Sequence, residues 1–330
     1  MGFRIPGEFE PHERTLMAWP VHASWGDRLE AARDAYADLA AAVAAFEPIT
    51  MLVNPGEAAG ARRALAGEAE IVEIPYESAW QRDSGPIVVV DDHGRRAGID
   101  FAFNAWGGRF PPWERTAAAS AAILEHLGIE RIPSDMVLEG GAITGDGEGT
   151  LITTEQCLLN PNRNPGMSRE DIEAELARTL GIATVVWLPY GITADLVTDG
   201  HVDAVCAFVR PGAVLFQACD DPAHPDFDRM AANRRVLEAT ADSAGRALEI
   251  IDLPTLPEPA DGLGVAYANI VLVNGGVILG VGGDPADDEA LAVLRAAFPD
   301  REVVAVGGTV FSYAGGGPHC TTMQIPKGAA

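Results

Sequence analysis

Apolar residues along this chain repeat with two different periods. Alanine-rich stretches with the spacing of an amphipathic helix occupy 27–46, 113–128, 168–181, 227–245 and 285–298. Ser168 followed by Asp171 predicts a capping box at the start of the third helix. Gly128, Gly181 and Gly245 predict helix ends, because glycine readily adopts the left-handed conformation found there.

Short apolar strands follow several of these helices, in the segments ITMLV, TVVWL, LEIIDL and EVVAV. Between them, pairs of apolar segments with glycine at the turn predict β-hairpins at 85–101, 141–154, 203–218 and 268–280. The chain therefore repeats a unit of strand, strand, helix and strand. We find no low-complexity linker, and we expect residues 1–330 to form a single domain.

A polar motif stands at the entrance to each hairpin. The markers are Asp83, Glu139, His201, Asn269 and Cys320, and successive markers are separated by 51 to 68 residues. Steps of unequal but similar length indicate a diverged structural repeat. Because repeats around an axis bring equivalent positions together at the centre, we expect these residues to converge on one pocket.

Charge and cysteine content narrow the classes of function. The net charge is −25, which disfavours binding to nucleic acid or to anionic membranes and favours a cationic small molecule. The four cysteines show neither C-x-x-C spacing nor the density of a disulfide scaffold. The first residues, MGFRIPGEFEPHERT, do not have the pattern of a signal peptide, and no segment approaches the roughly 20 apolar residues of a membrane helix. We expect a cytoplasmic protein with reduced thiols.

The most unusual segment is AGGGPHC at 314–320, where three glycines and a proline precede His319 and Cys320. Glycine backbone N–H groups can stabilise a thiolate, which is the nucleophilic form of cysteine. A buried structural cysteine is the alternative interpretation, and it suits Cys157 and Cys206, which lie within apolar strand patterns. The loop alone leaves both interpretations open for Cys320.

His201 and two aspartates are the candidate partners of this thiol. In DGHVD, an extended backbone would place Asp203 on the same face as His201, where it could orient the imidazole or bind the substrate beside it. Asp83, in WQRDSGP, is either the centre of an Asx-turn or a second carboxylate for a planar cation. In an extended segment His319 would point away from Cys320, so we assign it no catalytic role.

These motifs resemble those of the agmatine deiminases, which are related to the bacterial peptidylarginine deiminases. The resemblance runs through nearly the whole chain, in WQRDSGPIVV, FNAWGGRFPPW, LEGGAITGDGEGTLITTEQCLLNPNRNP, DGHVD, YANIVLVNGGVI, the FPDREVV region and GGGPHC. It implies a five-bladed α/β propeller with pseudo-fivefold repeats, and family members are commonly homo-oligomers.

The resemblance also implies a mechanism without a metal or an organic cofactor. Asp83 and Asp203 would bind a guanidinium group, and Cys320 would attack its carbon. His201 would protonate the departing ammonia and then activate the water that releases a ureido product, N-carbamoylputrescine in the case of agmatine. We expect Trp80, Trp106, Glu139, Asp199 and Gly317 to contribute to substrate binding.

The surroundings of the nucleophile depart from the family pattern. Where agmatine-specific members read close to GGGNIHCITQQ, this chain has Gly317, Pro318 and Met323 in place of asparagine, isoleucine and a glutamine. Around His201, a typical DETDGHVDN is DLVTDGHVDAV here, so Asp195 is displaced and Ala204 replaces asparagine.

Three alternatives therefore stay open. The substrate could be arginine, a peptidyl arginine or an alkylguanidine, and a substrate carboxylate would require a cation such as Arg82, Arg109 or Arg163. The covalent intermediate could be intercepted by an amine, which would make the protein an amidinotransferase. A metal-binding or non-catalytic sensor could use the same polar residues, although they lack a recognisable zinc spacing.

Overall fold

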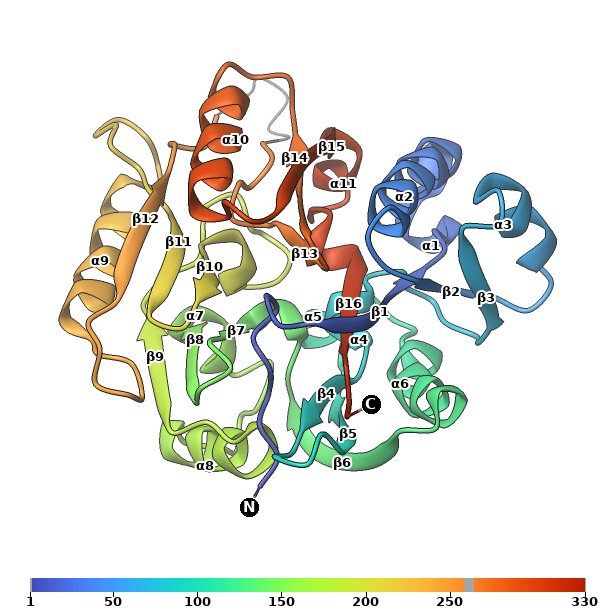
Figure 1. Ribbon diagram of the computed structural model, residues 1–330, viewed down its shortest axis with the longest axis horizontal. Coiled ribbons are helices and arrows are strands. Elements are labelled where there is room, and N and C mark those ends of the chain that lie inside the picture. The colour runs from blue at the N-terminus through green and yellow to red at the C-terminus, as the bar shows by residue number, and fades with distance from the viewer. Residues whose placement is uncertain (1, 258–263, 330) are drawn as a thin grey trace.

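The computed structural model describes residues 2–257 and 264–329, whose strands form five small sheets in a mixed α/β fold (Figure 1). Four sheets have three strands each. In each of these, two antiparallel strands form a hairpin, and the chain then passes through a helix to a third strand that runs parallel to the second. The unit of strand, strand, helix and strand expected from the apolar pattern is therefore present.

The elements of these four sheets are, in chain order, β4 (Ile87–Val90), β5 (Arg96–Ala102), α6 (Glu114–Leu127) and β6 (Glu130–Val137); β7 (Ile143–Gly145), β8 (Thr150–Thr154), α8 (Arg169–Leu180) and β9 (Thr184–Leu188); β10 (Cys206–Arg210), β11 (Ala213–Gln217), α9 (Phe227–Ala239) and β12 (Glu249–Leu253); and β13 (Val271–Val273), β14 (Gly276–Val281), α10 (Ala286–Ala297) and β15 (Glu302–Gly307).

The fifth sheet joins the two ends of the chain, in the strand order β16-β1-β2-β3. Its elements are β16 (Thr322–Pro326), β1 (His12–Ala18), α2 (Leu29–Ala44), β2 (Ile49–Val53), α3 (Ala58–Ala64) and β3 (Ala69–Glu73). Figure 1 shows the C-terminal strand β16 beside β1, with which it pairs in an antiparallel register. Cys320 therefore lies just before a strand of the sheet that also contains the first strand of the chain.

Short helices connect the larger elements. They are α1 (His22–Trp25), η1 (Gly26–Arg28), α4 (Gln81–Ser84), α5 (Ala105–Gly108), η2 (Gly140–Ala142), α7 (Glu155–Leu158), η3 (Val202–Ala204), α11 (Thr309–Tyr313) and η4 (His319–Thr321). Four of them, α4, η2, η3 and η4, immediately precede the first strand of a sheet. These four carry or adjoin the polar motifs singled out from the sequence.

Local sequence signals explain three of the helix ends. Ser168 and Asp171 form the predicted capping box of α8, and Gly128 and Gly181 cap α6 and α8 in the left-handed conformation. The prediction for Gly245 is wrong, because α9 ends at Ala239 and Thr240 is its C-cap in an extended conformation. Gly245 instead lies in the turn beside the bridge between Ala241 and Ala247.

Helices also link neighbouring sheets. Helix α9 contacts β9, α10 contacts β12 and α2 contacts β15, so each of these helices packs against the last strand of the preceding sheet. Apolar side chains such as Tyr36, Leu39, Phe216 and Leu294 are completely or almost completely buried in these layers. The short helices that precede the first strands also contact one another. Helix α4 contacts both η2 and η4, and η2 contacts η3. The short helices that carry the polar motifs are therefore neighbours.

Within the described parts of the chain, every helix is too short or too polar to cross a lipid bilayer.

Candidate active site

Cys320 lies in η4 and is partly exposed. Its Sγ accepts hydrogen bonds from the Gly317 backbone N–H and from Asn269 Nδ2, both at 3.3 Å. The thiol donates to Asp203 Oδ2 at 3.4 Å. Burial, followed by the negative charges of Asp203 and Asp83, raises the pKa of this thiol well above its usual value, and the two N–H donors only partly oppose the shift. Burial and both carboxylates therefore favour the thiol form of Cys320 over the thiolate.

The glycines of AGGGPHC are explained by close approach. A Cβ atom at Gly317 would lie 2.2 Å from Asn269 Oδ1, and one at Gly316 would lie 2.7 Å from the ring of Trp80. Asn269 Oδ1 also accepts the His319 backbone N–H at 3.0 Å. Glycine at 317 therefore lets one asparagine hold both the loop and the sulfur of Cys320.

His319, to which the sequence assigned no role, lies between two carboxylates. Its Nδ1 contacts Asp203 Oδ2 at 3.1 Å and its Nε2 contacts Glu8 Oε2 at 2.9 Å. Burial lowers the pKa of His319 and so does the charge of Arg82, but Glu8 and Asp203 raise it by more, so the net shift is upward. The expectation that His319 points away from Cys320 rested on an extended backbone. The residue lies instead in η4, and its ring and the sulfur of Cys320 share one oxygen of Asp203.

His201 lies between a different pair of carboxylates. Its Nδ1 is 3.7 Å from Asp83 Oδ1 and its Nε2 is 3.9 Å from Glu139 Oε2. Burial lowers the pKa of His201, but Asp83 and the neighbouring Cys157 and Glu139 raise it well above its usual value. The DGHVD segment is not extended, because η3 begins directly after His201, and Asp203 hydrogen-bonds His319 and Cys320.

Asp83 lies in α4 and is not at the centre of an Asx-turn. Trp106 Nε1 donates to its Oδ2 at 2.9 Å and the Gly141 backbone N–H donates to its Oδ1 at 3.1 Å. Burial raises the pKa of Asp83 to about 6, although the charge of His201 and the bond from Trp106 oppose the shift. The pKa of Asp203, by contrast, is lowered, because His319 and His201 outweigh its burial.

Gly141 marks the point where the polar groups meet. A Cβ atom at this position would lie 2.6 Å from His201 Nδ1, 2.8 Å from Asp83 Oδ1 and 3.1 Å from Asp203 Oδ2. These contacts show that the imidazole and both carboxylates surround one small region of space. Any side chain at residue 141 would displace them.

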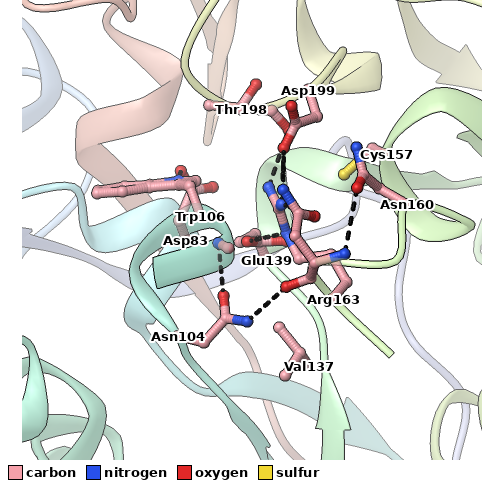
Figure 2. Close-up of polar contacts among 12 residues, drawn as sticks. Asp83, Asn104, Trp106, Val137, Glu139, Cys157, Asn160, Arg163, Thr198 and Asp199 are labelled. Atoms are coloured by element: carbon pink, nitrogen blue, oxygen red, sulfur yellow. Dashed lines mark hydrogen bonds and ion pairs between the residues drawn. The ribbon is translucent and has the colours of Figure 1, made fainter. Parts of the chain in front are cut away.

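Glu139 and Asp199 belong to a buried ion-pair network centred on Arg163 (Figure 2). Arg163 Nε donates to Glu139 Oε1 at 2.7 Å, and its Nη1 donates to Asp199 Oδ2 at 2.8 Å. Asp199 also pairs with Arg109. The pKa of Glu139 is lowered, because His201 and Arg163 outweigh the opposing effect of its burial. Glu139 is therefore an anion beside His201.

A cavity of about 530 Å³ leads to Cys320 and Asp83. Its wall is largely aromatic and includes Trp80, Phe103, Trp106, Phe110 and Trp113. Glu77 and Arg109 line the same cavity. Of the three arginines considered for a substrate carboxylate, Arg82 contacts Glu8, Arg163 contacts Glu139, and only Arg109 lines this cavity among the described residues.

Sequence reasoning missed Glu8 and underestimated Asn269 and His319. Asn269 occupies the marker position before β13, so its place in the repeat was the available signal. Glu8 lies in a turn before β1 and carries no motif. Its side chain contacts both Arg82 and His319, and together they lower its pKa to about 2 against the opposing effect of burial.

Known proteins resemble this chain over nearly its full length. The family model for Porphyromonas-type peptidyl-arginine deiminase matches residues 4–326. An agmatine deiminase from Pseudomonas aeruginosa strain LESB58 is 43% identical, with 98% of this chain and 96% of the relative covered. One from Stutzerimonas stutzeri is 41% identical, with the same coverage. The solved structure of the Enterococcus faecalis agmatine deiminase superposes with a TM-score of 0.93 at 35% identity, covering 99% of this chain and 96% of that one.

Proposed function

The chain belongs to the Porphyromonas-type peptidyl-arginine deiminase family, and we propose that it hydrolyses the guanidino group of agmatine to give N-carbamoylputrescine and ammonia. The observation that carries the proposal is that Cys320, His201 and two carboxylates, Asp83 and Asp203, face one region beside Gly141 and an aromatic cavity. Two buried carboxylates match a planar cation, which can donate to both of them. A sulfur held beside them is placed to attack the central carbon.

Binding of the cation activates the nucleophile. In the free protein the negative charges of Asp203 and Asp83 help to hold Cys320 in its thiol form. A guanidinium bound to the same carboxylates neutralises them and replaces the thiol as the partner of Asp203. The pKa of Cys320 then falls, so the thiol releases its proton to solvent and the thiolate forms where its target is already in place.

His201 handles the protons in both halves of the reaction. Attack of the Cys320 sulfur forms a C–S bond, and the imidazolium gives its proton to the departing nitrogen, so that the C–N bond breaks and ammonia leaves. The neutral imidazole then accepts a proton from water as the water oxygen attacks the same carbon. The C–S bond then breaks, the remaining hydroxyl proton passes to the sulfur, and the ureido product leaves with Cys320 restored as a thiol. The raised pKa of His201 supplies the charged form for the first half.

The far end of the cavity supports agmatine over arginine. Arg109 is already paired with Asp199, so a substrate carboxylate would have to compete for it. Glu77 lines the same cavity and offers a carboxylate to a terminal ammonium. Thr116 donates to its Oε2, and the Arg115 backbone N–H and guanidinium lie 3.4 and 3.8 Å from its Oε1, with Arg115 exposed to solvent. We assign Glu77 to the ammonium, with the aromatic residues, Trp80 included, lining the alkyl chain.

The test is ammonia release from agmatine, butylguanidine, arginine and an arginyl peptide. Agmatine should be the best substrate, and release should disappear in Cys320→Ala. Glu77→Gln should raise KM for agmatine about tenfold, the value of one charged hydrogen bond, and leave KM for butylguanidine nearly unchanged. Undiminished release by Cys320→Ala would overturn the mechanism, and a preference for arginine would overturn the substrate assignment.

We further propose that the five sheets are the blades of an α/β propeller within a single catalytic domain. The support is that each sheet has a polar marker just before its first strand, and that helices α9, α10 and α2 each pack on the preceding sheet. We also propose that the protein forms a homo-oligomer and is located in the cytoplasm, as expected from the sequence.

A further inference from the structure

A second cluster of potential ligands lies on the far side of His201. Glu139, Cys157 and His201 each offer one atom, and the three atoms lie within 4.8 Å of one another. The relative exposures of these residues are 0%, 0% and 2%. The residues that line the cavity at Cys320 include neither Glu139 nor Cys157 among the described parts of the chain. The mechanism proposed above makes no use of the Cys157 thiol.

Two atoms of the cluster are buried and unpartnered. Among residues 2–257 and 264–329, Glu139 Oε2 and His201 Nε2 have no hydrogen-bond partner. They face each other at 3.9 Å, which is too long for a hydrogen bond. Buried polar atoms are almost always satisfied, so an unpaired acceptor beside an unpaired imidazole nitrogen points to a missing partner.

The other polar atom of each side chain, Glu139 Oε1 or His201 Nδ1, faces a residue outside the cluster. Arg163 Nε donates to Glu139 Oε1 at 2.7 Å, which leaves Oε2 directed toward His201. His201 Nδ1 faces Asp83 Oδ1 at 3.7 Å, so a cation on Nε2 would complete the carboxylate–histidine–metal order found in many metal sites. Figure 2 shows Glu139 held by Arg163, with Asp83 and Cys157 labelled nearby.

The donor set matches one class of cation. One imidazole nitrogen, one thiolate and one carboxylate are ligands of Zn²⁺, and three protein ligands leave a fourth position open. Tetrahedral Zn²⁺ requires neighbouring ligand atoms to be about 3.3 to 3.7 Å apart, given the usual bond lengths. For a nitrogen–oxygen pair the lower value applies, so the 3.9 Å between Glu139 Oε2 and His201 Nε2 would have to shorten by about 0.6 Å.

We propose that Glu139, Cys157 and His201 bind Zn²⁺ and that the bound ion inhibits the enzyme. Binding releases the thiol proton of Cys157 and any proton on His201 Nε2. No atom changes its oxidation state. The ion is then coordinated by the same imidazole that must exchange protons with the leaving group and with water, so the ring can no longer become an imidazolium. Of the three proposed ligands, His201 lines a small cavity of about 90 Å³ that also reaches Cys320. Binding itself is independent of the proposed activity, whereas inhibition rests on it.

The binding test uses Co²⁺ as a spectroscopic substitute for Zn²⁺. The starting protein carries Cys320→Ala and Cys219→Ala, so that only the two fully buried thiols, Cys157 and Cys206, remain. We expect one equivalent of Co²⁺ to produce a sulfur-to-metal charge-transfer band that Zn²⁺ abolishes. Cys157→Ala in this background should remove the band, while the equally buried control Cys206→Ala should keep it.

Absence of the band in the starting protein, or its persistence after Cys157→Ala, would overturn the proposal. If Cys157→Ala does not fold, as judged by circular dichroism, Cys157→Ser replaces it with a similar volume and the same expected loss. A His201→Asn variant should weaken Co²⁺ binding at least tenfold.

A second measurement addresses inhibition in the native enzyme. Zn²⁺ should inhibit turnover, a chelator should restore it, and Cys157→Ser should raise the inhibitory concentration at least tenfold, with Cys206→Ser as the control. If the band behaves as expected but no substrate is turned over, the metal site stands and the proposed function fails.

Discussion

Two buried histidines each lie between two carboxylates, but at different distances. His319 makes hydrogen bonds of 2.9 Å to Glu8 and 3.1 Å to Asp203. His201 lies 3.7 Å from Asp83 and 3.9 Å from Glu139, beyond hydrogen-bond reach. A ring with both nitrogens engaged is fixed in place, whereas a ring with unbound nitrogens can exchange protons with a substrate. A histidine, an aspartate and a glutamate thus form a structural anchor at His319 and an acid–base group at His201.

Exchanging each histidine for glutamine tests this difference most strongly. His201→Gln should reduce kcat for agmatine about 10²- to 10⁴-fold, the usual contribution of a general acid–base group. His319→Gln should reduce kcat much less and lower the melting temperature more. Steady-state kinetics and thermal unfolding of both variants provide the measurement. If both variants fold and His319→Gln loses as much kcat as His201→Gln, then His319 is not simply a structural anchor.

Asp203 connects the anchor to the nucleophile, so Asp203→Asn should have the next largest effect. We expect kcat/KM to fall about 10- to 100-fold, the value of a charged hydrogen bond to the substrate. In the free enzyme the pKa of Cys320 should also fall, because the Asp203 charge opposes the thiolate. The pH dependence of iodoacetamide alkylation measures the second effect. An unchanged or higher thiol pKa would contradict this role for Asp203.

Glu8→Gln should affect stability more than catalysis. In the folded protein Arg82 and His319 lower the pKa of Glu8 to about 2, against the effect of burial. Because this folded pKa is below the unfolded one, Glu8 stabilises the fold above about pH 4.5 and loses that contribution as the pH falls toward 2. At neutral pH the variant should lose about 2 kcal/mol of unfolding free energy.

Urea unfolding of the native protein and of Glu8→Gln, from neutral to acidic pH, measures this loss. The difference between the two proteins should shrink as the pH falls. A difference that does not depend on pH would mean that the charge of Glu8 is not what anchors His319.

The smallest expected effect concerns Asp83. Its pKa is raised to about 6, so the carboxylate is lost below that pH and kcat/KM for a guanidinium should fall on the acid side. Trp106 donates to Asp83 and lowers its pKa. Trp106→Phe should therefore shift the acid limb of the kcat/KM profile to higher pH, by less than about one unit. A shift toward lower pH would show that another group controls this limb.

The repeat of hairpins and helices could be predicted because each unit uses local signals. Two apolar segments separated by a turn glycine define β10 and β11, and the Ser168 capping box marks the start of α8. The positions of Asp83 and His201 before hairpins, and of Cys320 before the last strand β16, also predicted their convergence. The structure places Asp83 and His201 around Gly141, and Cys320 is joined to the same region by its hydrogen bond to Asp203.

What local patterns could not supply is the partner of each polar group. The pairing of β16 with β1 joins opposite ends of the chain, and it brings Glu8 to His319, 311 residues away. The assumption of an extended backbone at DGHVD paired His201 with Asp203, whereas the short helix η3 turns Asp203 toward His319. Which polar groups become hydrogen-bond partners depends on tertiary packing, and the local sequence around each residue carries no information about it.

The most direct test of the account is to identify the atom that carries the intermediate. The native enzyme should be mixed with agmatine, quenched in acid within one turnover, digested and analysed by mass spectrometry. The account predicts that the peptide containing Cys320 gains the mass of agmatine less ammonia, and that Cys157→Ser gives the same adduct. Product formation without an adduct on Cys320, or with an adduct on another residue, would contradict it.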